Sequence, residues 1–459
     1  MPDRQRENDR ADVPSLLGEL GDVIWLSFPI VVTVMSRVVM QFVDALLLSM
    51  YGQGELAAVV PAAMTVMVVG AIIIGVLSCN TTFVSQVLGQ GQPRLGSRYT
   101  VHAIYAGFLL QLIFLPAIPL AGRIFGFFGH AQEVQVLEVQ YFRIRMLHLG
   151  SLGVSIACAT FFQAVGRPKV PMVAAIVGNA ANVFGNWLLI FGNWGLPELG
   201  IRGAAIATVA GGYIQAGILL AVFTSWRYHR KYRTRRWLPF EWSMMAQLLR
   251  VGVGSGITML LDIGSFAVFI NFVVGRLGGA ILAGNNAAMQ LLHLAFVPAM
   301  GLNVGVTALV GRHIGAGNIP RAKRSAYVGM GLAGGSAVLF GLGFVLFRRQ
   351  LIGIFSDDPA TVRAGGTILC YMALFLISNA LAMVSHGALK GAGDTKWPAI
   401  MWALVAWLFF VPLGLILGNR AVLGLHGAWL AATLYIWLLD AFLISRFVSE
   451  RWRHIDIFR

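Results

Sequence analysis

The sequence predicts an all-α membrane protein with twelve transmembrane helices in two six-helix lobes. Composition, the spacing of the apolar runs and an internal repeat support this prediction. Of 459 residues, 58% are hydrophobic and 12% are charged, whereas soluble domains contain about 25% charged residues. So few polar side chains cannot cover a globule of this length in water. The composition therefore excludes a soluble enzyme, and it also excludes a disordered, collagen-like or coiled-coil chain.

Apolar runs bounded by polar residues, Gly or Pro define the predicted spans, because a helix needs about 20 apolar residues to cross a bilayer. The twelve runs are 23–50, 56–88, 100–122, 137–165, 168–192, 200–225, 246–275, 281–311, 324–347, 366–389, 396–418 and 421–446.

The basic residues indicate the orientation of these spans. The net charge is +15, and most Lys and Arg residues fall in the tails and the even-numbered loops, which predicts that both termini are cytoplasmic. The densest basic run, Trp226–Arg236, joins the sixth and seventh spans. Its interleaved aromatics could suggest RNA binding, but contact with anionic lipid is the favoured interpretation, and we expect no nucleic-acid partner. The first 20 residues have no apolar segment of the signal-peptide kind, so they predict a solvated tail.

The two halves of the chain resemble each other at a nearly constant offset. The matching blocks are Leu56-Ala57 with Leu282-Ala283, Gly75 with Gly301, Gly89–Gly91 with Gly315–Gly317, Gly166 with Gly393, and Leu199–Ala204 with Leu423–Ala428. Each half holds six spans, so the lobes share one orientation and are related by a pseudo-twofold axis along the membrane normal. Two such lobes around a central cavity are typical of transporters.

This repeat divides the chain into five parts. They are a cytoplasmic tail, an N-lobe, a basic cytoplasmic linker, a C-lobe and a second cytoplasmic tail, over residues 1–22, 23–225, 226–245, 246–446 and 447–459.

Three acidic residues inside predicted spans are candidates for function, because a charge there costs roughly 3 kcal/mol and so indicates function by default. Asp44 and Asp262 lie in long apolar contexts. Asp440 lies close to the cytoplasmic end of its span, six residues before Arg446, and a structural role is favoured there. Neither Asp44 nor Asp262 has an acidic counterpart at the matching position of the other half. The internal repeat therefore does not account for these two acids, and each lobe acquired its own.

Asn179, Asn182 and Asn186 share one face of the fifth span, because they follow the helical spacing. They could hydrogen-bond neighbouring helices, or together with Asp44 they could form an oxygen-rich site for a proton or a monovalent cation. Arg37 lies two turns before Asp44 on roughly the same face, about 10 Å along the axis, and could pair with it through a water.

The remaining candidate ligands predict no metal site. The intramembrane histidines show no metal-ligand spacing, and the cysteines lie in apolar stretches where structural disulfides are not expected. These residues are His102, His148, His293, His386, Cys79, Cys158 and Cys370.

Short motifs across both halves resemble the multidrug and toxic compound extrusion (MATE) transporters. In the first half they are Leu26–Pro29 before Val43-Asp44, Glu55–Ala58, Gln86–Gly91, Gly178–Asn182 with Asn186, Gly195–Gly200 and Gly203–Thr208. In the second half they are Asp262–Phe266, Val274–Gly278, Gly301, Gly315–Gly317 and Gly387–Gly391 before Asp394-Thr395.

The resemblance implies an antiporter, not an enzyme, that exports organic cations or other amphipathic compounds in exchange for protons or sodium ions. It also implies a bacterial inner membrane location, no cofactor beyond the coupling ion and, as we expect, a monomer. Asp44 matches the first-helix acid of the family, and Asn182, Asn186 and Thr208 match the polar residues of the same site. Asp262 matches the seventh-helix acid of the C-lobe.

Three positions depart from the family pattern, and all three make the cavity more positive. Asn186 stands where aspartate is frequent, Asn379 stands where many members carry a tenth-helix acid, and Arg37 replaces an uncharged residue. These departures weaken the expectation of a cationic substrate. They motivate an alternative function, a flippase for a lipid-linked anionic precursor. An integral membrane enzyme has little support, because no clustered His, Asp and Glu set and no nucleophile elbow is present.

Overall fold

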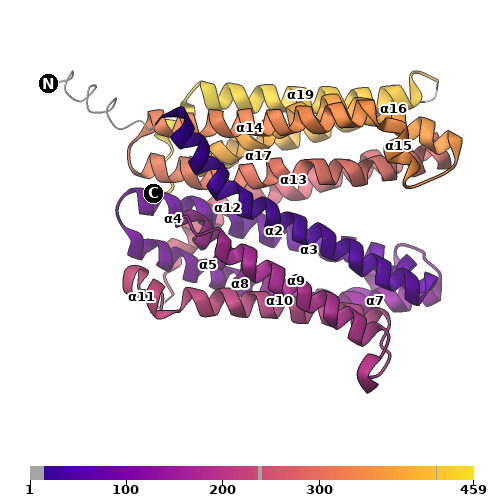
Figure 1. Cartoon of the computed structure of the whole chain (residues 1–459), viewed down its shortest axis with the longest axis horizontal. Coiled ribbons are helices and arrows are strands. Elements are labelled where there is room, and N and C mark those ends of the chain that lie inside the picture. Colours follow the sequence, from indigo (N-terminus) through magenta and orange to yellow (C-terminus); the bar gives the residue numbers. More distant parts are fainter. Residues whose placement is uncertain (1–14, 236–239, 420, 459) are drawn as a thin grey trace. The chain divides into compact units, whose positions relative to one another are not determined.

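The computed structural model describes residues 15–235, 240–419 and 421–458, and within these ranges it contains helices and no β-strand (Figure 1). Helices are expected because, in hydrocarbon, each backbone N–H and C=O must find its partner within the protein. The predicted tails and the basic linker include residues 1–14, 236–239 and 459, which lie outside the described residues. Among the described residues, the first helix begins at Leu16, before the predicted start of the first span at residue 23.

The first half of the chain folds into helices that follow the predicted spans in order. They are α2 (Leu16–Tyr51), α3 (Gln53–Ser78), α4 (Asn80–Gly89), α5 (Pro93–Phe114), α6 (Ala117–Gly126), α7 (Gln132–Met146), α8 (His148–Ala164), α9 (Lys169–Ile190), η1 (Asn193–Gly195), α10 (Ile201–Phe223) and α11 (Trp226–Tyr232).

The second half repeats this order with different interruptions. Its helices are α12 (Trp242–Val268), η2 (Phe269–Val274), η3 (Gly275–Leu277), α13 (Gly279–Gly315), α14 (Ile319–Leu346), α15 (Arg348–Gly353), α16 (Pro359–Gly391), α17 (Lys396–Leu404), η4 (Val405–Phe410), α18 (Val411–Leu417), α19 (Gly424–Val448) and η5 (Arg451–His454).

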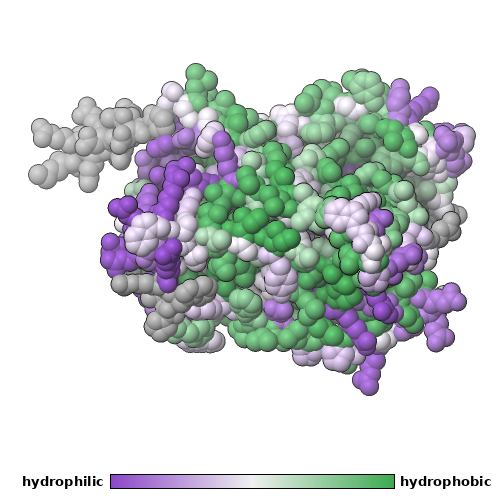
Figure 2. All heavy atoms as spheres, turned by 60° about the horizontal axis from the view of Figure 1, so that its bottom comes forward, coloured by the Kyte–Doolittle hydropathy of each residue, from purple (hydrophilic) through white to green (hydrophobic). Residues whose placement is uncertain are grey.

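Ten of the described helical segments are long and apolar enough to cross a membrane. Two bent pairs raise the number to twelve, because α5 joins α6 at 52° and α7 joins α8 at 42°. The outer surface is consistent with immersion in lipid. In the face drawn in Figure 2, hydrophobic side chains cover broad areas and hydrophilic ones gather toward the helix ends. The predicted all-α membrane fold class is confirmed.

The chain forms two compact units whose boundaries fall inside helices. One unit comprises Val32–Gly256, and the other comprises Met1–Val31 together with Ile257–Arg459. The sequence analysis placed the boundary in the basic linker at 226–245. In the structure, the first half of α2 instead packs with the later helices, and the first half of α12 packs with the earlier ones. Each unit therefore contains half of a helix that continues into the other unit.

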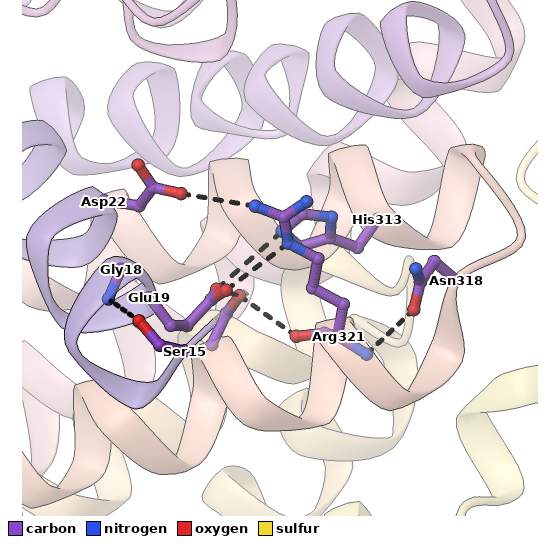
Figure 3. A network of polar contacts seen from close by, with 8 residues as sticks. Ser15, Gly18, Glu19, Asp22, His313, Asn318 and Arg321 are labelled. Atoms are coloured by element: carbon purple, nitrogen blue, oxygen red, sulfur yellow. Dashed lines mark hydrogen bonds and ion pairs between the residues drawn. The ribbon is translucent and has the colours of Figure 1, made fainter. Parts of the chain in front are cut away.

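Buried Glu19 fastens the first half of α2 to its unit (Figure 3). Its side chain is 0% exposed, and its Oε2 lies 3.4 Å from Nε of Arg321 on α14. Oγ of Ser325 donates a hydrogen bond to the other carboxylate oxygen, and Nε2 of His313 lies 3.9 Å from it. Arg321 also reaches Asp22, at 3.3 Å. An acid without solvent exposure keeps its place through such partners, because removing one of them leaves a buried charge unpaired.

An analogous contact fastens the first half of α12 to the other unit. Arg98 on α5 forms an ion pair with Glu241, and both side chains are about a third exposed. The backbone N–H of Glu241 also donates to Nε2 of His102, at 2.9 Å. Further along α12, Gly256 lies against Gly75 of α3, where a Cβ added to Gly75 would sit 2.3 Å from the Cα of Gly256. In the other unit the repeat counterpart of Gly75, Gly301, is in equally close contact with α2.

One pair of matching helices differs between the halves. In the second half α16 runs unbroken from Pro359 to Gly391, and Asp358 caps its start by accepting hydrogen bonds from Ala360 N and Thr361 N. Its counterpart in the first half is broken at Leu147 into α7 and α8. The hydroxyl of Tyr213 donates to the carbonyl of Leu147, at 3.1 Å. Broken spanning helices are typical of transporter binding sites.

Candidate functional site

A chain of hydrogen bonds in the Val32–Gly256 unit ends on Asp44. Nδ2 of Asn186 donates to Oδ1 of Asp44 and also, at 3.4 Å, to Oδ1 of Asn182. Nδ2 of Asn182 donates to Oγ1 of Thr208 at 3.1 Å, and that hydroxyl donates to the carbonyl of Ala204 at 2.9 Å. The structure thus brings together Asp44, Asn182, Asn186 and Thr208, four of the residues that the sequence analysis named.

Helix geometry places these groups together. Asn182 and Asn186 are one turn apart on α9, and both are buried, at 1% and 0% exposed. They face α10, which carries Thr208, and α2, which carries Asp44. Their neighbour Asn179 points to a different partner, because its Nδ2 donates to Oγ of Ser36 at 2.8 Å. The three asparagines therefore share a helix face, but the hydrogen-bond chain to Asp44 contains only two of them.

Arg37 lies outside this chain. Its side chain is exposed, and among the described residues it forms no ion pair with Asp44. The charge of Arg145, on α7, acts on Asp44. Arg145 also lies near Tyr141, one turn earlier on the same helix, with its Cζ 5.9 Å from the ring centroid.

The second candidate acid, Asp262, has aromatic partners. Nε1 of Trp402 donates to its Oδ1 at 2.9 Å, and the hydroxyl of Tyr435 donates to the same oxygen at 3.4 Å. Tyr435 is fully buried and stacks on Phe410, with ring centroids 4.6 Å apart. The surroundings of Asp262 are therefore a rigid aromatic enclosure with two hydrogen-bond donors, in contrast to the amide chain at Asp44.

Two other polar residues of this unit form no hydrogen bond to Asp262 in the described part of the chain. Oδ1 of Asn379 is buried and has no hydrogen-bond partner within the described ranges, and the same is true of Oδ1 of Asp440. Arg446, the basic residue after Asp440, pairs instead with Asp394, at 2.7 Å. Within the described ranges no hydrogen bond joins Asn379 to Asp262, and no ion pair joins Asp440 to Arg446.

Three residues that bear on these acids were not named from the sequence. Arg145 falls inside the predicted span 137–165, where a charge is itself a functional signal. Trp402 and Tyr435 carry an N–H and an O–H in the middle of apolar runs, and buried Trp and Tyr usually need an acceptor for these groups. Sequence alone does not show that both side chains donate their hydrogen bonds to Asp262.

The two sites suit proton or cation chemistry at oxygen. Asp44 is the only ionisable member of its hydrogen-bond chain, and Oδ1 of Asn186 is buried without a partner among the described residues. One carboxylate beside amide and hydroxyl oxygens can hold a proton or a hard cation. No cluster of three or more His, Cys, Asp or Glu side chains that could bind a metal occurs in the described part of the chain.

Comparisons with known proteins agree with this architecture. The MatE family model matches residues 29–188 and 255–416. The Multidrug resistance protein NorM of Burkholderia vietnamiensis is 30% identical, over 96% of this chain and 94% of its own length. The Probable multidrug resistance protein NorM of Thermotoga maritima is 26% identical, over 96% and 94%.

A solved structure shares the fold at low sequence identity. It is a MOP superfamily transporter from Pyrococcus furiosus, with a TM-score of 0.86, 18% identity and coverage of 95% of this chain and 97% of that chain. Its description says that the reverse polarity of its binding pocket suggests a different function.

Proposed function

The chain belongs to the MATE family of multi-pass membrane transporters, and on that premise we propose that it is a secondary active antiporter. It exports organic cations or other amphipathic compounds, and the uptake of protons or sodium ions drives this export by alternating access. The relatives from Burkholderia vietnamiensis and Thermotoga maritima, whose names describe multidrug resistance, support this substrate range. The protein is a transporter and not an enzyme.

The observation that carries the proposal is the hydrogen-bond chain that ends on Asp44. Every side-chain donor in it points to an acceptor, so a change in charge can occur only at the carboxylate. When Asp44 is ionised, it accepts a hydrogen bond from Asn186 and attracts a cationic group. A bound proton or sodium ion cancels that attraction, so the coupling ion and a cationic group of the substrate compete for one carboxylate.

Competition drives export only if each ligand favours a different state of the transporter. A ligand shifts a conformational equilibrium by no more than its difference in affinity for the two states. Typical coupling free energies of about 1–3 kcal/mol correspond to roughly 5- to 150-fold changes in affinity. Asp44 is placed for this role because its protonation or cation binding changes the charge at the end of a buried polar chain that links α2, α9 and α10.

The proposal is tested with the purified protein in proteoliposomes. Transport of a fluorescent amphipathic cation is followed under an imposed proton gradient or an imposed sodium gradient, with protein-free liposomes and an ionophore as controls. We expect transport under one of the two gradients and its loss when the ionophore dissipates that gradient. Absence of transport under both gradients would contradict the proposal.

A flippase for a lipid-linked anionic precursor is the second candidate function. Arg37 supports it, because this exposed basic side chain forms no ion pair among the described residues. The likeness in fold to a transporter described as having a pocket of reversed polarity is consistent with it. The test is translocation of a fluorescent polyprenyl phosphate across liposome membranes. If Arg37→Gln translocates this lipid as fast as the wild type, the flippase proposal is abandoned.

We also propose that the protein is a monomer in a bacterial inner membrane with both termini in the cytoplasm. The bacterial origin of the relatives and the basic residues of the tails and even-numbered loops support this placement. Labelling of single cysteines introduced at the two tails with an impermeant reagent tests the orientation. Labelling in intact spheroplasts, before the membrane is opened, would contradict it.

A further inference from the structure

A groove beside the start of α14 is lined by residues of a single unit. Its volume is about 700 Å³, within the range of about 300–1,000 Å³ that is usual for ligand sites. Leu16 and Leu20, from the first turns of α2, form one wall, and η5 contributes Arg453. These residues and the α14 wall all belong to the unit of Met1–Val31 and Ile257–Arg459. The groove shares no lining residue with the sites of the buried acids.

Helix α14 gives the groove two chemically different ends. Its lining residues recur every three or four positions from Pro320 to Leu332, so they share one face of the helix. Lys323 and Arg324 lie in the first turns, and Val328 and Leu332 follow further along. Leu332 lies about 14 Å along the axis from Lys323, at 1.5 Å per residue. The groove is therefore basic at the start of the helix and apolar deeper along it.

The basic end carries an excess of positive charge. Glu450 forms ion pairs with both Lys323 and Arg453, so one acid serves two bases. Arg324 forms no ion pair in the described part of the chain. Together these four side chains carry three positive charges and one negative charge. The start of α14 adds the partial positive charge of its helix dipole. This end of the groove therefore favours an anionic group.

The walls of the groove are fixed by contacts behind them. Trp452 of η5 is 1% exposed, and its Nε1 donates to the carbonyl of Phe447 at 2.8 Å, which anchors the segment that carries Arg453. On the opposite wall, the ion pair between Glu19 and Arg321 joins α2 to α14 (Figure 3). An occupant does not have to order these elements, so little of its binding free energy is lost to organising the site.

We propose that this groove binds one anionic phospholipid, with the phosphate on Lys323 and Arg324 and an acyl chain along α14 toward Leu332. Guanidinium is suited to phosphate because its N–H groups form charge-assisted hydrogen bonds to the oxygens. Tyr327 lines the groove between its two ends, and Tyr is enriched at the headgroup level of membranes. Basic pockets between helices at the cytoplasmic face are suited to anionic headgroups. A water-soluble phosphate would leave the apolar end exposed to water.

The test compares two lipids that share their acyl chains and differ in headgroup charge. Delipidated full-length protein in detergent is titrated with dioleoyl phosphatidylglycerol, which is anionic, or with dioleoyl phosphatidylcholine, which is zwitterionic. Native mass spectrometry measures the binding constant of the first lipid. We expect the wild type to bind phosphatidylglycerol about tenfold more tightly, the size expected when one or two basic side chains face the headgroup.

Substitutions at the basic end identify the source of this preference. Arg324→Gln should lose most of the preference for phosphatidylglycerol, and Arg324→Lys should keep most of it, because the positive charge remains. Arg451 is the matched control, because it is an exposed basic residue of η5 that does not line the groove. Arg451→Gln should therefore show the same preference as the wild type.

A substitution at the apolar end tests whether an acyl chain lies there. Gly331 lines the groove, and a Cβ added to it would meet no heavy atom within 4 Å, so Gly331→Leu fills the groove without a clash. We expect this variant to bind both lipids severalfold more weakly. Gly335, one turn later, has the same open space but does not line the groove. Gly335→Leu is the matched control, with the same gain in helix propensity, and should bind both lipids as the wild type does.

Three results would overturn the inference. Equal binding of the two lipids by the wild type would mean that another part of the chain or a second copy fills the groove. An unchanged preference in Arg324→Gln, or unchanged affinities in Gly331→Leu, would place the lipid elsewhere. Displacement of phosphatidylglycerol by excess glycerol phosphate would assign the basic end to a soluble phosphate. Because no gradient and no transported compound are used, these outcomes are independent of the antiport proposal.

Discussion

The two units of the molecule share a framework but differ at their buried acids. Each unit holds half of a long helix through an acidic residue near the start of that half, Glu19 in one and Glu241 in the other. At the centre of the units the likeness ends. Asp44 sits at the end of an amide chain near Arg145, whereas Asp262 is enclosed by Trp402 and Tyr435.

This difference indicates which features the internal repeat preserves. Each unit needs the same close helix packing. Gly75 and Gly301 therefore recur at matching positions, and each allows a crossing helix to approach closely. Ion and substrate binding needs only one site, and that site must have polar groups available to bind either ligand. The amide chain at Asp44 leaves one acceptor without a partner among the described residues, Oδ1 of Asn186, while both donors around Asp262 bond to that acid. On the proposed function, this difference favours coupling in the unit Val32–Gly256.

The largest expected effect on stability is the difference between substituting Glu19 and substituting Glu241, the acids near the starts of α2 and α12. Glu19 has no solvent exposure, so Glu19→Gln leaves Arg321 with a weakened partner and should lower the free energy of unfolding by about 3 kcal/mol. Glu241 is a third exposed, and Glu241→Gln should cost under about 1 kcal/mol. Thermal unfolding of both variants in one detergent measures the difference. Equal losses would show that burial does not distinguish the two contacts.

The next effect concerns the amide chain. Asn186→Leu removes the donor to Asp44 and the link to Asn182, and we expect ion-driven transport to fall about tenfold, within the usual range of coupling energies. Asn179→Leu is the matched control, because Asn179 bonds Ser36 and lies outside the chain. Initial rates in proteoliposomes provide the measurement. A rate in Asn186→Leu no lower than in Asn179→Leu would remove the chain from the coupling account.

A smaller effect is expected in the aromatic enclosure of the other unit. Tyr435→Phe removes one hydrogen bond of 3.4 Å to Asp262 and leaves the donor Trp402 in place. The free energy of unfolding should fall by about 1 kcal/mol, while the transport rate stays near that of the wild type. Thermal unfolding and a transport assay on the same preparation test both parts. A large loss of transport at unchanged stability would assign coupling to Asp262 as well.

The smallest effect concerns the cap of α16, the unbroken counterpart of α7 and α8. Hydrogen bonds from the side chain and backbone of Thr361, and from the backbone of Ala360, hold the pKa of Asp358 below its usual range. Because the pKa is lower in the folded state, the charged cap stabilises the helix start above about pH 4. That contribution is lost as the pH falls through the lowered pKa.

Hydrogen exchange of the first turn of α16 measures this cap directly. Asp358→Asn is the matched variant, because its amide oxygen still accepts hydrogen bonds but carries no charge. The wild type should be slightly better protected than the variant at pH 7, and the difference should shrink as the pH is lowered below about 4. A difference that persists at the lower pH would mean that the charge of Asp358 does not strengthen the cap.

Much of the architecture could be predicted from the sequence, because hydrocarbon allows few alternatives to helices. The apolar runs therefore predicted the helical segments, and the helical spacing of Asn182 and Asn186 placed them on one face. The unit boundaries could not be predicted in this way. Apolar content shows where a helix lies, but it does not show that α2 packs its first half against one set of helices and its second half against another.

The site was predictable to a similar extent. Asp44, Asn182, Asn186 and Thr208 follow from buried polarity and from the family resemblance. Arg145 was visible as a charge inside a span, but sequence spacing does not show which residues it lies beside. The partners of Asp262 depend on how α12, α17 and α19 pack, and sequence spacing carries no information on contacts between distant helices.

The most direct test of the account compares Asp44→Asn with Asp262→Asn in proteoliposomes under the gradient that drives the wild type. Asparagine keeps the size of each side chain but cannot be ionised, so only the carboxylate chemistry is lost. The account predicts that Asp44→Asn loses ion-driven transport, while Asp262→Asn retains a substantial part of it. Normal ion-driven transport by Asp44→Asn would contradict the assignment of coupling to this site.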